Sequence, residues 1–92
     1  MALVLIIDDN TDMLAMLEMF FQRRTPHEVI LCQNGREGLE RAYERPPDVA
    51  LVDVMMPGLD GYEVVRRLRA NPDTENIGII ILTARGQQVD QQ

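Results

Sequence analysis

Four short apolar runs occur along the chain, and each of the first three is followed by a segment with helical periodicity. The runs comprise residues 3–7, 29–32, 49–52 and 77–82. No Asn-Gly or Asp-Gly turn joins two of them directly, and their spacing leaves room for a helix, which favours β–α units over hairpins. Three of the runs consist almost entirely of Val, Ile and Leu. This composition is typical of parallel strands that are covered on both faces.

The segment after the first run predicts an amphipathic helix. Arg23 and Arg24 suit its C-terminal end, where the backbone dipole is negative. Its apolar residues fall on one stripe at helical spacing, which we expect to pack against the sheet. The stripe comprises Met13, Leu14, Leu17, Phe20 and Phe21.

Capping boxes predict the starts of the second and third helices, because a polar residue that can cap a helix is followed three residues later by Glu. The pairs are Asn34 with Glu37 and Asp60 with Glu63. Pro-Pro at 46–47 and Asn-Pro at 71–72 are expected to end these helices. The predicted inward faces are Leu39, Ala42 and Tyr43 in the second helix and Val64, Val65 and Leu68 in the third.

The predicted order of elements is therefore β-α-β-α-β-α-β, and residues 86–92 are compatible with the start of a further helix. Right-handed crossovers turn this order into an α/β fold, an open parallel sheet with helices on both faces. We expect one small domain over residues 1–92. In such sheets ligands bind beyond the C-terminal ends of the strands, at the point where the strand order reverses.

The charge of the chain limits its partners. The formal net charge is −6, so the chain gains nothing from the counterion release that drives nucleic-acid binding. We therefore expect no nucleic-acid partner, and no membrane partner, because anionic surfaces repel an acidic protein. The apolar residues 1–7 lack a basic flank and are too short for a signal peptide or a membrane span. The single cysteine, Cys32, cannot form an internal disulfide, which fits a reducing cytoplasm.

Acidic residues follow the predicted strands where ligands are expected. Asp8 and Asp9 end the first strand, Asp53 ends the third and Thr83 ends the fourth. In the doubly wound order 2-1-3-4 the first and third strands are neighbours, and the three carboxylates would crowd one mouth and repel one another. A bound Mg²⁺ ion would neutralise their charge, and carboxylate oxygens are ligands that this ion prefers. Each aspartate alone is also compatible with a helix cap, so the prediction depends on all three.

A turn follows Asp53. Pro57 and Gly58 suit the two central positions of a type II turn, which would direct the backbone carbonyl of Met55 toward the same mouth. Any strand-to-helix loop needs a turn, however, so this feature alone does not indicate a site.

Three segments together resemble the CheY-like receiver domain of two-component response regulators. They are Ile-Ile-Asp-Asp-Asn at 6–10, Leu-Val-Asp-Val-Met-Met-Pro-Gly-Leu-Asp-Gly at 51–61 and Ile-Ile-Leu-Thr-Ala at 80–84. They occur in the order and at the spacing of the family, and the similarity covers the whole chain. The resemblance implies a flavodoxin-like topology with strand order 2-1-3-4.

The resemblance also implies roles for the acidic residues. Asp53 would be the phosphoacceptor, which attacks a phosphohistidine on a sensor histidine kinase or a histidine phosphotransfer protein. Asp8 and Asp9 would bind Mg²⁺ directly or through water, and Asp53 and the carbonyl of Met55 would complete the protein ligands. The cation would neutralise charge during in-line phosphoryl transfer.

At the end of the fourth strand, the resemblance makes Thr83 the switch hydroxyl that hydrogen-bonds the phosphoryl group, and the small Ala84 leaves room for it. A full receiver domain also has a fifth strand, a fifth helix and a lysine just after that strand. The chain contains no lysine, because all nine basic residues are arginine. We expect the fifth strand and helix to be absent, which would leave 77–82 as an apolar sheet edge. We then expect a homo-oligomer formed through this strand or through the uncovered sheet face.

Three functions are compatible with these residues. The leading hypothesis is a phosphorylation-switched signalling module that is not an enzyme. The first alternative is a truncated, phosphorylation-incompetent fragment that acts only in protein interaction or oligomerisation, which the missing lysine favours. The second is a Mg²⁺-dependent phosphatase or nuclease, which would need a general base that the sequence does not offer. His27 is expected to be a solvated loop residue.

Overall fold

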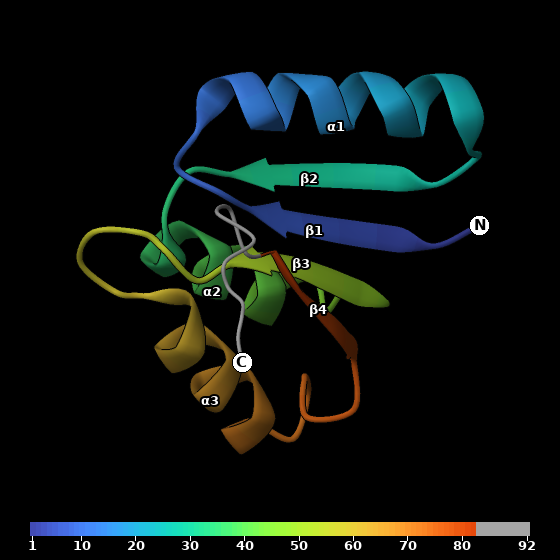
Figure 1. The fold of residues 1–92 in the computed structure, drawn as a ribbon. Coiled ribbons are helices and arrows are strands. Elements are labelled where there is room, and N and C mark those ends of the chain that lie inside the picture. The colour runs from blue at the N-terminus through green and yellow to red at the C-terminus, as the bar shows by residue number, and fades with distance from the viewer. Residues whose placement is uncertain (83–92) are drawn as a thin grey trace, which may run out of the picture.

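Four parallel strands form one sheet, with helices on both of its faces (Figure 1). The computed structural model describes residues 1–82 of the 92-residue chain. The strands are β1 (Leu3–Ile7), β2 (Glu28–Cys32), β3 (Val49–Asp53) and β4 (Gly78–Leu82). The helices are α1 (Thr11–Arg24), α2 (Gly35–Glu44) and α3 (Gly61–Ala70). The elements alternate along the chain as the sequence predicted.

The strand order is β2-β1-β3-β4, and every neighbouring pair is parallel. This order confirms the predicted topology. The two central strands are in register, so that Ile7 at the end of β1 lies opposite Val52 in β3. The residues that follow these two positions therefore emerge side by side at one edge of the sheet. The sheet has four strands within residues 1–82, and the predicted helix start at 86–92 lies outside that range.

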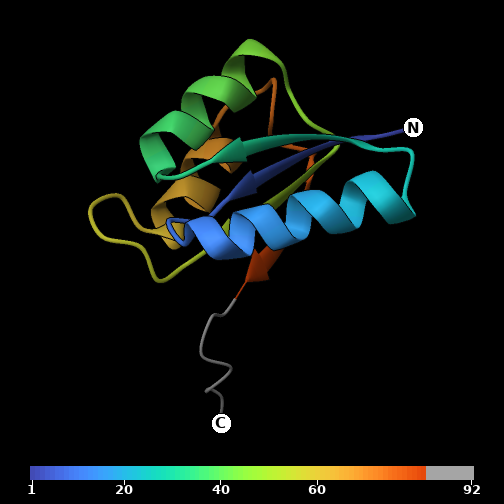
Figure 2. The ribbon, with the colours of Figure 1, turned by 90° about the horizontal axis from the view of Figure 1, so that it is seen from above.

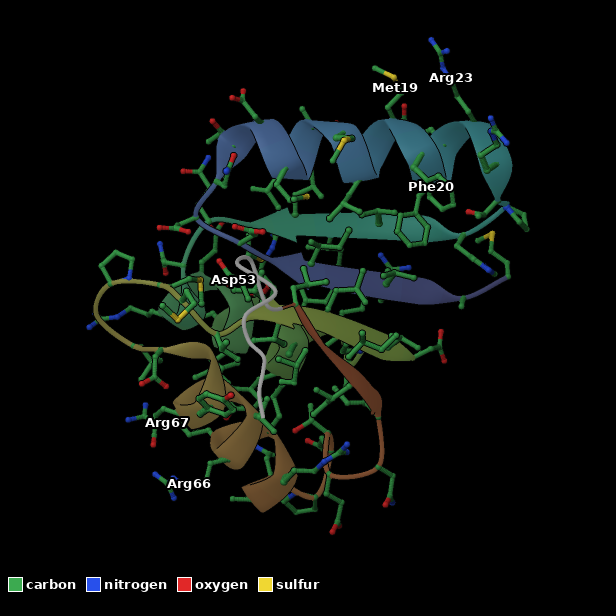
Figure 3. The ribbon with its side chains drawn as sticks, viewed as in Figure 1. Met19, Phe20, Arg23, Asp53, Arg66 and Arg67 are labelled. Atoms are coloured by element: carbon green, nitrogen blue, oxygen red, sulfur yellow. The ribbon has the colours of Figure 1, made fainter. Side chains whose placement is uncertain are left out.

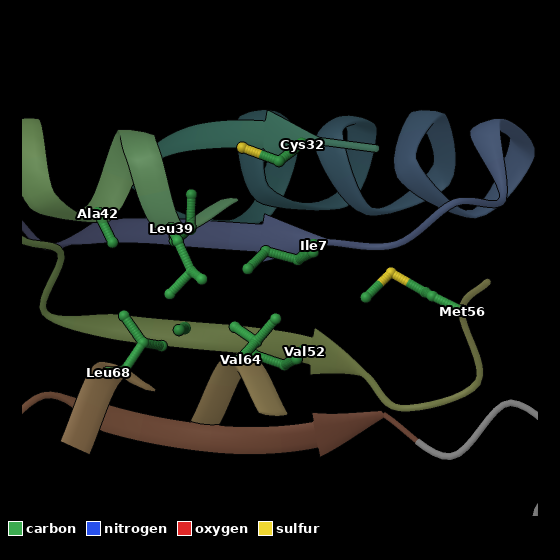
Figure 4. Close-up of a cluster of buried hydrophobic side chains, with 10 residues drawn as sticks. Ile7, Cys32, Leu39, Ala42, Val52, Met56, Val64 and Leu68 are labelled. Carbon is green, nitrogen blue, oxygen red and sulfur yellow. The ribbon is translucent and has the colours of Figure 1, made fainter. Parts of the chain in front are cut away.

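Helices α2 and α3 cover one face of the sheet. Leu39 and Ala42 of α2, and Val64 and Leu68 of α3, are fully or almost fully buried against it (Figure 4). The strand residues in this cluster are Leu5, Ile7, Cys32, Ala50 and Val52. Burial raises the pKa of the Cys32 thiol to about 11, and this cysteine behaves as the small buried hydrophobe that a structural thiol usually is.

Within residues 1–82, α1 is the one helix that covers the other face (Figure 2). Leu14 is buried against β1, while Leu17 and Phe21 are half-buried at the same interface. The prediction for Phe20 was wrong, because 52% of its surface is exposed. The prediction for Tyr43 on α2 was also wrong, because 39% of its surface is exposed. Both residues lie at the margin of their helical stripe, and the stripe is wider than the contact each helix makes with the sheet.

Each predicted capping box has two hydrogen bonds, and the structure confirms the one that the cap side chain accepts. Asn34 Oδ1 accepts from the N–H of Glu37, and Asp60 Oδ1 accepts from the N–H of Glu63. The reciprocal bonds were predicted wrongly. The Glu37 carboxylate accepts from the N–H of Gln33 rather than from the cap residue. The Glu63 carboxylate pairs with arginines one turn along α3 instead, because a charged partner competes successfully with a backbone N–H.

His27 is not the solvated loop residue that the sequence suggested. It is half-buried, and its Nδ1 accepts a hydrogen bond of 2.9 Å from the N–H of Ala2. This bond anchors the start of the chain beside the start of β2. Among residues 1–82, no helix has the length and apolar character needed to cross a membrane.

Candidate functional site

Three carboxylates meet at the C-terminal edge of the sheet. Asp8 and Asp9 follow β1, and Asp53 is the last residue of β3. One oxygen from each lies within 4.8 Å of the others. Asp53 is 3% exposed and Asp8 is 5% exposed, while Asp9 faces solvent. The prediction that these residues lie together is confirmed, because β1 and β3 are parallel neighbours and their C-terminal ends lie at the same edge of the sheet (Figure 3).

Backbone N–H groups orient the two buried carboxylates. Asp8 Oδ1 accepts from the N–H of Asn10 at 2.9 Å, and Asp53 Oδ1 accepts from the N–H of Met55 at 3.0 Å. Each bond closes a tight turn two residues after the aspartate. Asn10 has a second role that the sequence analysis missed, since its side chain caps α1 by accepting from the N–H of Met13. Its position directly after two aspartates and before a helical stripe could have revealed it.

The electrostatics of the cluster oppose full ionisation. Burial raises the pKa of the Asp8 carboxyl above its ordinary value, and the N–H of Asn10 acts in the opposite direction. The charges of Asp53 and, more weakly, of Asp9 raise it further. Buried like charges at this distance destabilise one another unless a proton or a cation neutralises them.

The donor set fits a hard divalent cation. Among residues 1–82 this trio is the group of acidic, cysteine or histidine side chains with metal-binding spacing. All three members offer carboxylate oxygens, the ligands that Mg²⁺ and Ca²⁺ prefer over nitrogen and sulfur. Two of the three carboxylates are buried and have little contact with water. A cation held here would stabilise the negative charge that water cannot reach.

The loop after Asp53 is built to return the chain to α3. Met56 is buried in the cluster beneath α2 and α3, whereas Met55 is exposed. Gly58 has a φ of +75°, as the second central position of the predicted type II turn requires. A Cβ atom on Gly61 would lie 2.3 Å from the carbonyl oxygen of Asp53. Only glycine therefore lets the first turn of α3 approach the end of β3 this closely, a constraint that the sequence analysis did not identify.

Two of the predicted site residues cannot be placed. Thr83 and Ala84 lie outside the described residues, directly after β4. Leu82, the last residue of β4, lies opposite Asp53 in the sheet register. The described part of the site therefore consists of three carboxylates, the loop from Met55 to Gly58 and the first turn of α3.

Comparison with known proteins gives a consistent result. Residues 4–92 match the response regulator receiver domain family. Protein PilH of Pseudomonas aeruginosa is 37% identical over 92 residues, which cover 99% of this chain and 74% of PilH. The transcriptional regulatory protein AfsQ1 of Streptomyces coelicolor is 39% identical over 87 residues, which cover 95% of this chain and 37% of AfsQ1.

Solved structures agree with this match. The receiver domain of a sensor histidine kinase from Pseudomonas aeruginosa superposes with a TM-score of 0.87 at 29% identity, over 97% of this chain and 72% of that one. That crystal structure has a magnesium ion coordinated in its active-site cleft. The fold, the family match over nearly the whole chain and the relatives at more than 30% identity lead to one conclusion. This chain belongs to the response regulator receiver domain family.

Proposed function

We propose that this chain is the phosphoacceptor module of a two-component phosphorelay and that Asp53 receives the phosphoryl group. The proposal depends mainly on one observation. The buried Asp53 carboxylate lies at the C-terminal edge of the sheet with oxygens of Asp8 and Asp9 within 4.8 Å. The phosphodonor would be a phosphohistidine of a sensor histidine kinase or a histidine phosphotransfer protein.

In the proposed reaction, a carboxylate oxygen of Asp53 attacks the phosphorus of the phosphohistidine. The new P–O bond forms as the P–N bond breaks, and the electron pair of that bond stays with the donor imidazole. The product is an acyl phosphate on Asp53. The bond from the N–H of Met55 to Asp53 Oδ1 holds the carboxylate in one orientation, so the nucleophile is positioned before the donor arrives.

Asp8, Asp9, Asp53 and the backbone carbonyl of Met55 would hold the Mg²⁺ that this reaction needs. When bound, the cation supplies positive charge that offsets the negative charge of the transferring phosphoryl oxygens. The carboxylates themselves would repel an incoming phosphoryl group if they were left uncompensated. We assign to Thr83 a hydrogen bond to the phosphoryl group and to Ala84 the space beside it, on the family resemblance of Ile-Ile-Leu-Thr-Ala at 80–84.

A mass measurement tests the proposal. The chain is incubated with Mg²⁺ and a small phosphodonor such as acetyl phosphate, and intact mass is recorded. We expect an increment of one phosphoryl group, which disappears in Asp53→Asn and when Mg²⁺ is chelated. Asp73→Asn is the matched control, because Asp73 is an exposed aspartate in the turn before β4. An unchanged increment in Asp53→Asn would refute the assignment.

A second candidate is a receiver-fold module that is not phosphorylated and acts only through protein contacts. Residues 1–92 contain no lysine, so no ammonium group within them can face the transferring oxygens, and this observation favours the second candidate for the chain as tested. The same mass experiment separates the two candidates. No increment in the parent chain, together with Mg²⁺ binding, would support this second function. Neither candidate assigns hydrolysis of an external substrate to the chain.

We also propose that the chain self-associates through β4 or the sheet face beside it. Within residues 1–82 this strand pairs only with β3, and the Ile80 side chain on it is 53% exposed. Exposed apolar edges favour pairing with another chain. Sedimentation velocity should show a dimer or larger species that Ile80→Lys converts to monomer. Monomeric parent protein at high concentration would refute this part. The free buried thiol of Cys32 fits the cytoplasm as the proposed location.

A further inference from the structure

A groove runs along the outer edge of β2, and none of the three carboxylates lines it. Strand β2 is the outermost strand on this side of the sheet, and Figure 2 looks onto its edge with α1 on one side and α2 on the other. The groove has a volume of about 430 Å³. Its floor is β2, and its walls come from Glu18 of α1 and from Arg41 and Glu44 of α2.

The floor of the groove offers backbone hydrogen-bonding groups. The N–H of Glu28 donates to the carbonyl of Ala2, and the carbonyl of Cys32 accepts from the N–H of Asp8. In a parallel ladder a residue directs its N–H and its C=O to the same neighbour, so alternate residues of β2 bond to β1. Val29 and Leu31 therefore direct their N–H and C=O groups outward, into the groove.

The walls carry charges that match an added strand. The Glu28 and Arg45 side chains at one end of the groove form a two-pronged ion pair at 2.8 Å and neutralise each other. No ion pair among residues 1–82 includes Arg41 or Glu18. Glu44, which lies one turn along α2 from Arg41, is also outside these ion pairs. The α2 wall therefore has one cation and one anion without an ion-pair partner among residues 1–82, and the α1 wall has one such anion, Glu18.

We propose that this groove binds an extended peptide segment of a partner protein by β-strand addition. The peptide backbone would bond to Val29 and Leu31, which lie half-buried on the groove floor. Successive side chains of an added strand point to opposite faces of the sheet. An acidic side chain would therefore reach Arg41 on the α2 face, and a basic side chain an odd number of positions away would reach Glu18 on the α1 face.

A pair of peptides tests the charge pattern. The probe is the end-blocked hexapeptide Thr-Val-Glu-Arg-Val-Thr, in which Glu and Arg point to opposite faces. The isomer Thr-Val-Glu-Val-Arg-Thr has the same composition, but its charges share one face. We expect the first peptide to shift the NMR amide signals of Val29 and Leu31, and the isomer to bind about twofold to fivefold more weakly. Equal binding of the two peptides would overturn the predicted pattern.

Backbone methylation tests the binding mode. Two versions of the probe carry N-methyl groups on its odd or on its even residues. Only one of these sets can face β2 in an added strand, so we expect one version to lose binding and the other to retain it. Retention by both versions would exclude strand addition.

Variants test whether Arg41 on the α2 wall of the groove contributes to binding. We expect Arg41→Gln to weaken binding of the probe about twofold to fivefold. Arg36→Gln is the matched control on the same helix, because Arg36 does not line this groove, and it should bind normally. The amide spectrum away from the groove reports whether each variant is folded. Loss of the Val29 and Leu31 signals at high protein concentration without peptide would show that a second copy fills the groove, and would overturn the proposal.

Discussion

The central strands β1 and β3 bury two kinds of side chain. Along their length the side chains are apolar, and those of Ile6, Ile7 and Val52 are fully enclosed. At their C-terminal ends the same strands bury the carboxylates of Asp8 and Asp53 to nearly the same degree. Equal burial therefore has opposite energetic consequences a few ångströms apart. The apolar stretch stabilises the fold, while the acidic end destabilises it until a cation neutralises it.

The largest expected effect comes from opening a cavity in the apolar region. Leu68 on α3 is 0% exposed and packs in the cluster between α2, α3 and the sheet. We expect Leu68→Ala to lower the free energy of unfolding by about 3 kcal/mol, through lost burial and the cavity left behind. Urea denaturation followed by circular dichroism measures it. Met19→Ala, at an exposed position on α1 (Figure 3), is the control and should change little. Similar losses in both variants would contradict the packing described.

The second effect lies where the two regions meet. In Gly61→Ala the new Cβ would lie 2.3 Å from the Asp53 carbonyl oxygen and 2.6 Å from the Cα of Val54. Both contacts are with backbone, so β3 and α3 must separate, and we expect a loss of about 2 kcal/mol in unfolding free energy. Gly58→Ala is the comparison, since it adds a side chain in open space at φ +75° and should lose about 1 kcal/mol. A larger loss in Gly58→Ala than in Gly61→Ala would show that the backbone conformation of the turn is the stricter requirement for glycine in this loop, and not the close approach of α3 to β3.

The third effect concerns the acidic end alone. We expect Mg²⁺ at tenfold over its Kd to raise the unfolding free energy by about 1.4 kcal/mol, because the cation binds only the folded cluster. The urea midpoint, measured against Mg²⁺ concentration, gives both the Kd and the stabilisation.

Two variants serve as controls for this effect. Asp53→Asn removes a charged ligand and should lose most of the response, while the exposed Asp73→Asn should keep it. If Asp53→Asn responds as the parent does, the three carboxylates do not form the binding site.

The apolar region could be predicted from sequence almost entirely. Strands of Val, Ile and Leu bounded by helical segments allow few arrangements, and the order β2-β1-β3-β4 follows from right-handed crossovers and the family resemblance. The meeting of Asp8 and Asp53 followed from that order, because both residues end neighbouring parallel strands.

What the sequence could not predict depends on competition between partners or on close approach. Glu63 fits a capping box by spacing, yet its carboxylate bonds to Arg66 and Arg67 one turn along the helix. Phe20 fits an apolar stripe, yet one helix presents only part of that stripe to the sheet. The need for Gly61 depends on the distance between α3 and the end of β3, which no local pattern encodes.

The smallest expected effect is a pH dependence of the unfolding free energy that comes from the buried Asp8 carboxyl. Burial, with the nearby Asp53 charge, raises the pKa of Asp8 in the folded chain above its unfolded value of about 3.9. Below that value the carboxyl is protonated in both states, so its favourable contribution is fully present. As pH rises through the folded pKa, the proton is lost from the buried group, and stability falls.

Glu63 contributes with the opposite sign, because its arginine partners lower its pKa to about 2. The parent alone therefore gives a mixed profile, and the informative quantity is the difference between the parent and Asp8→Asn. In metal-free buffer, the unfolding free energy of the parent should fall relative to Asp8→Asn as pH rises from 3.5, and saturating Mg²⁺ should reduce that fall. A difference that does not change with pH would mean that the surroundings of Asp8 do not destabilise its ionised carboxyl. The contrast between the apolar stretch of the strands and their acidic C-terminal ends would then have no electrostatic basis.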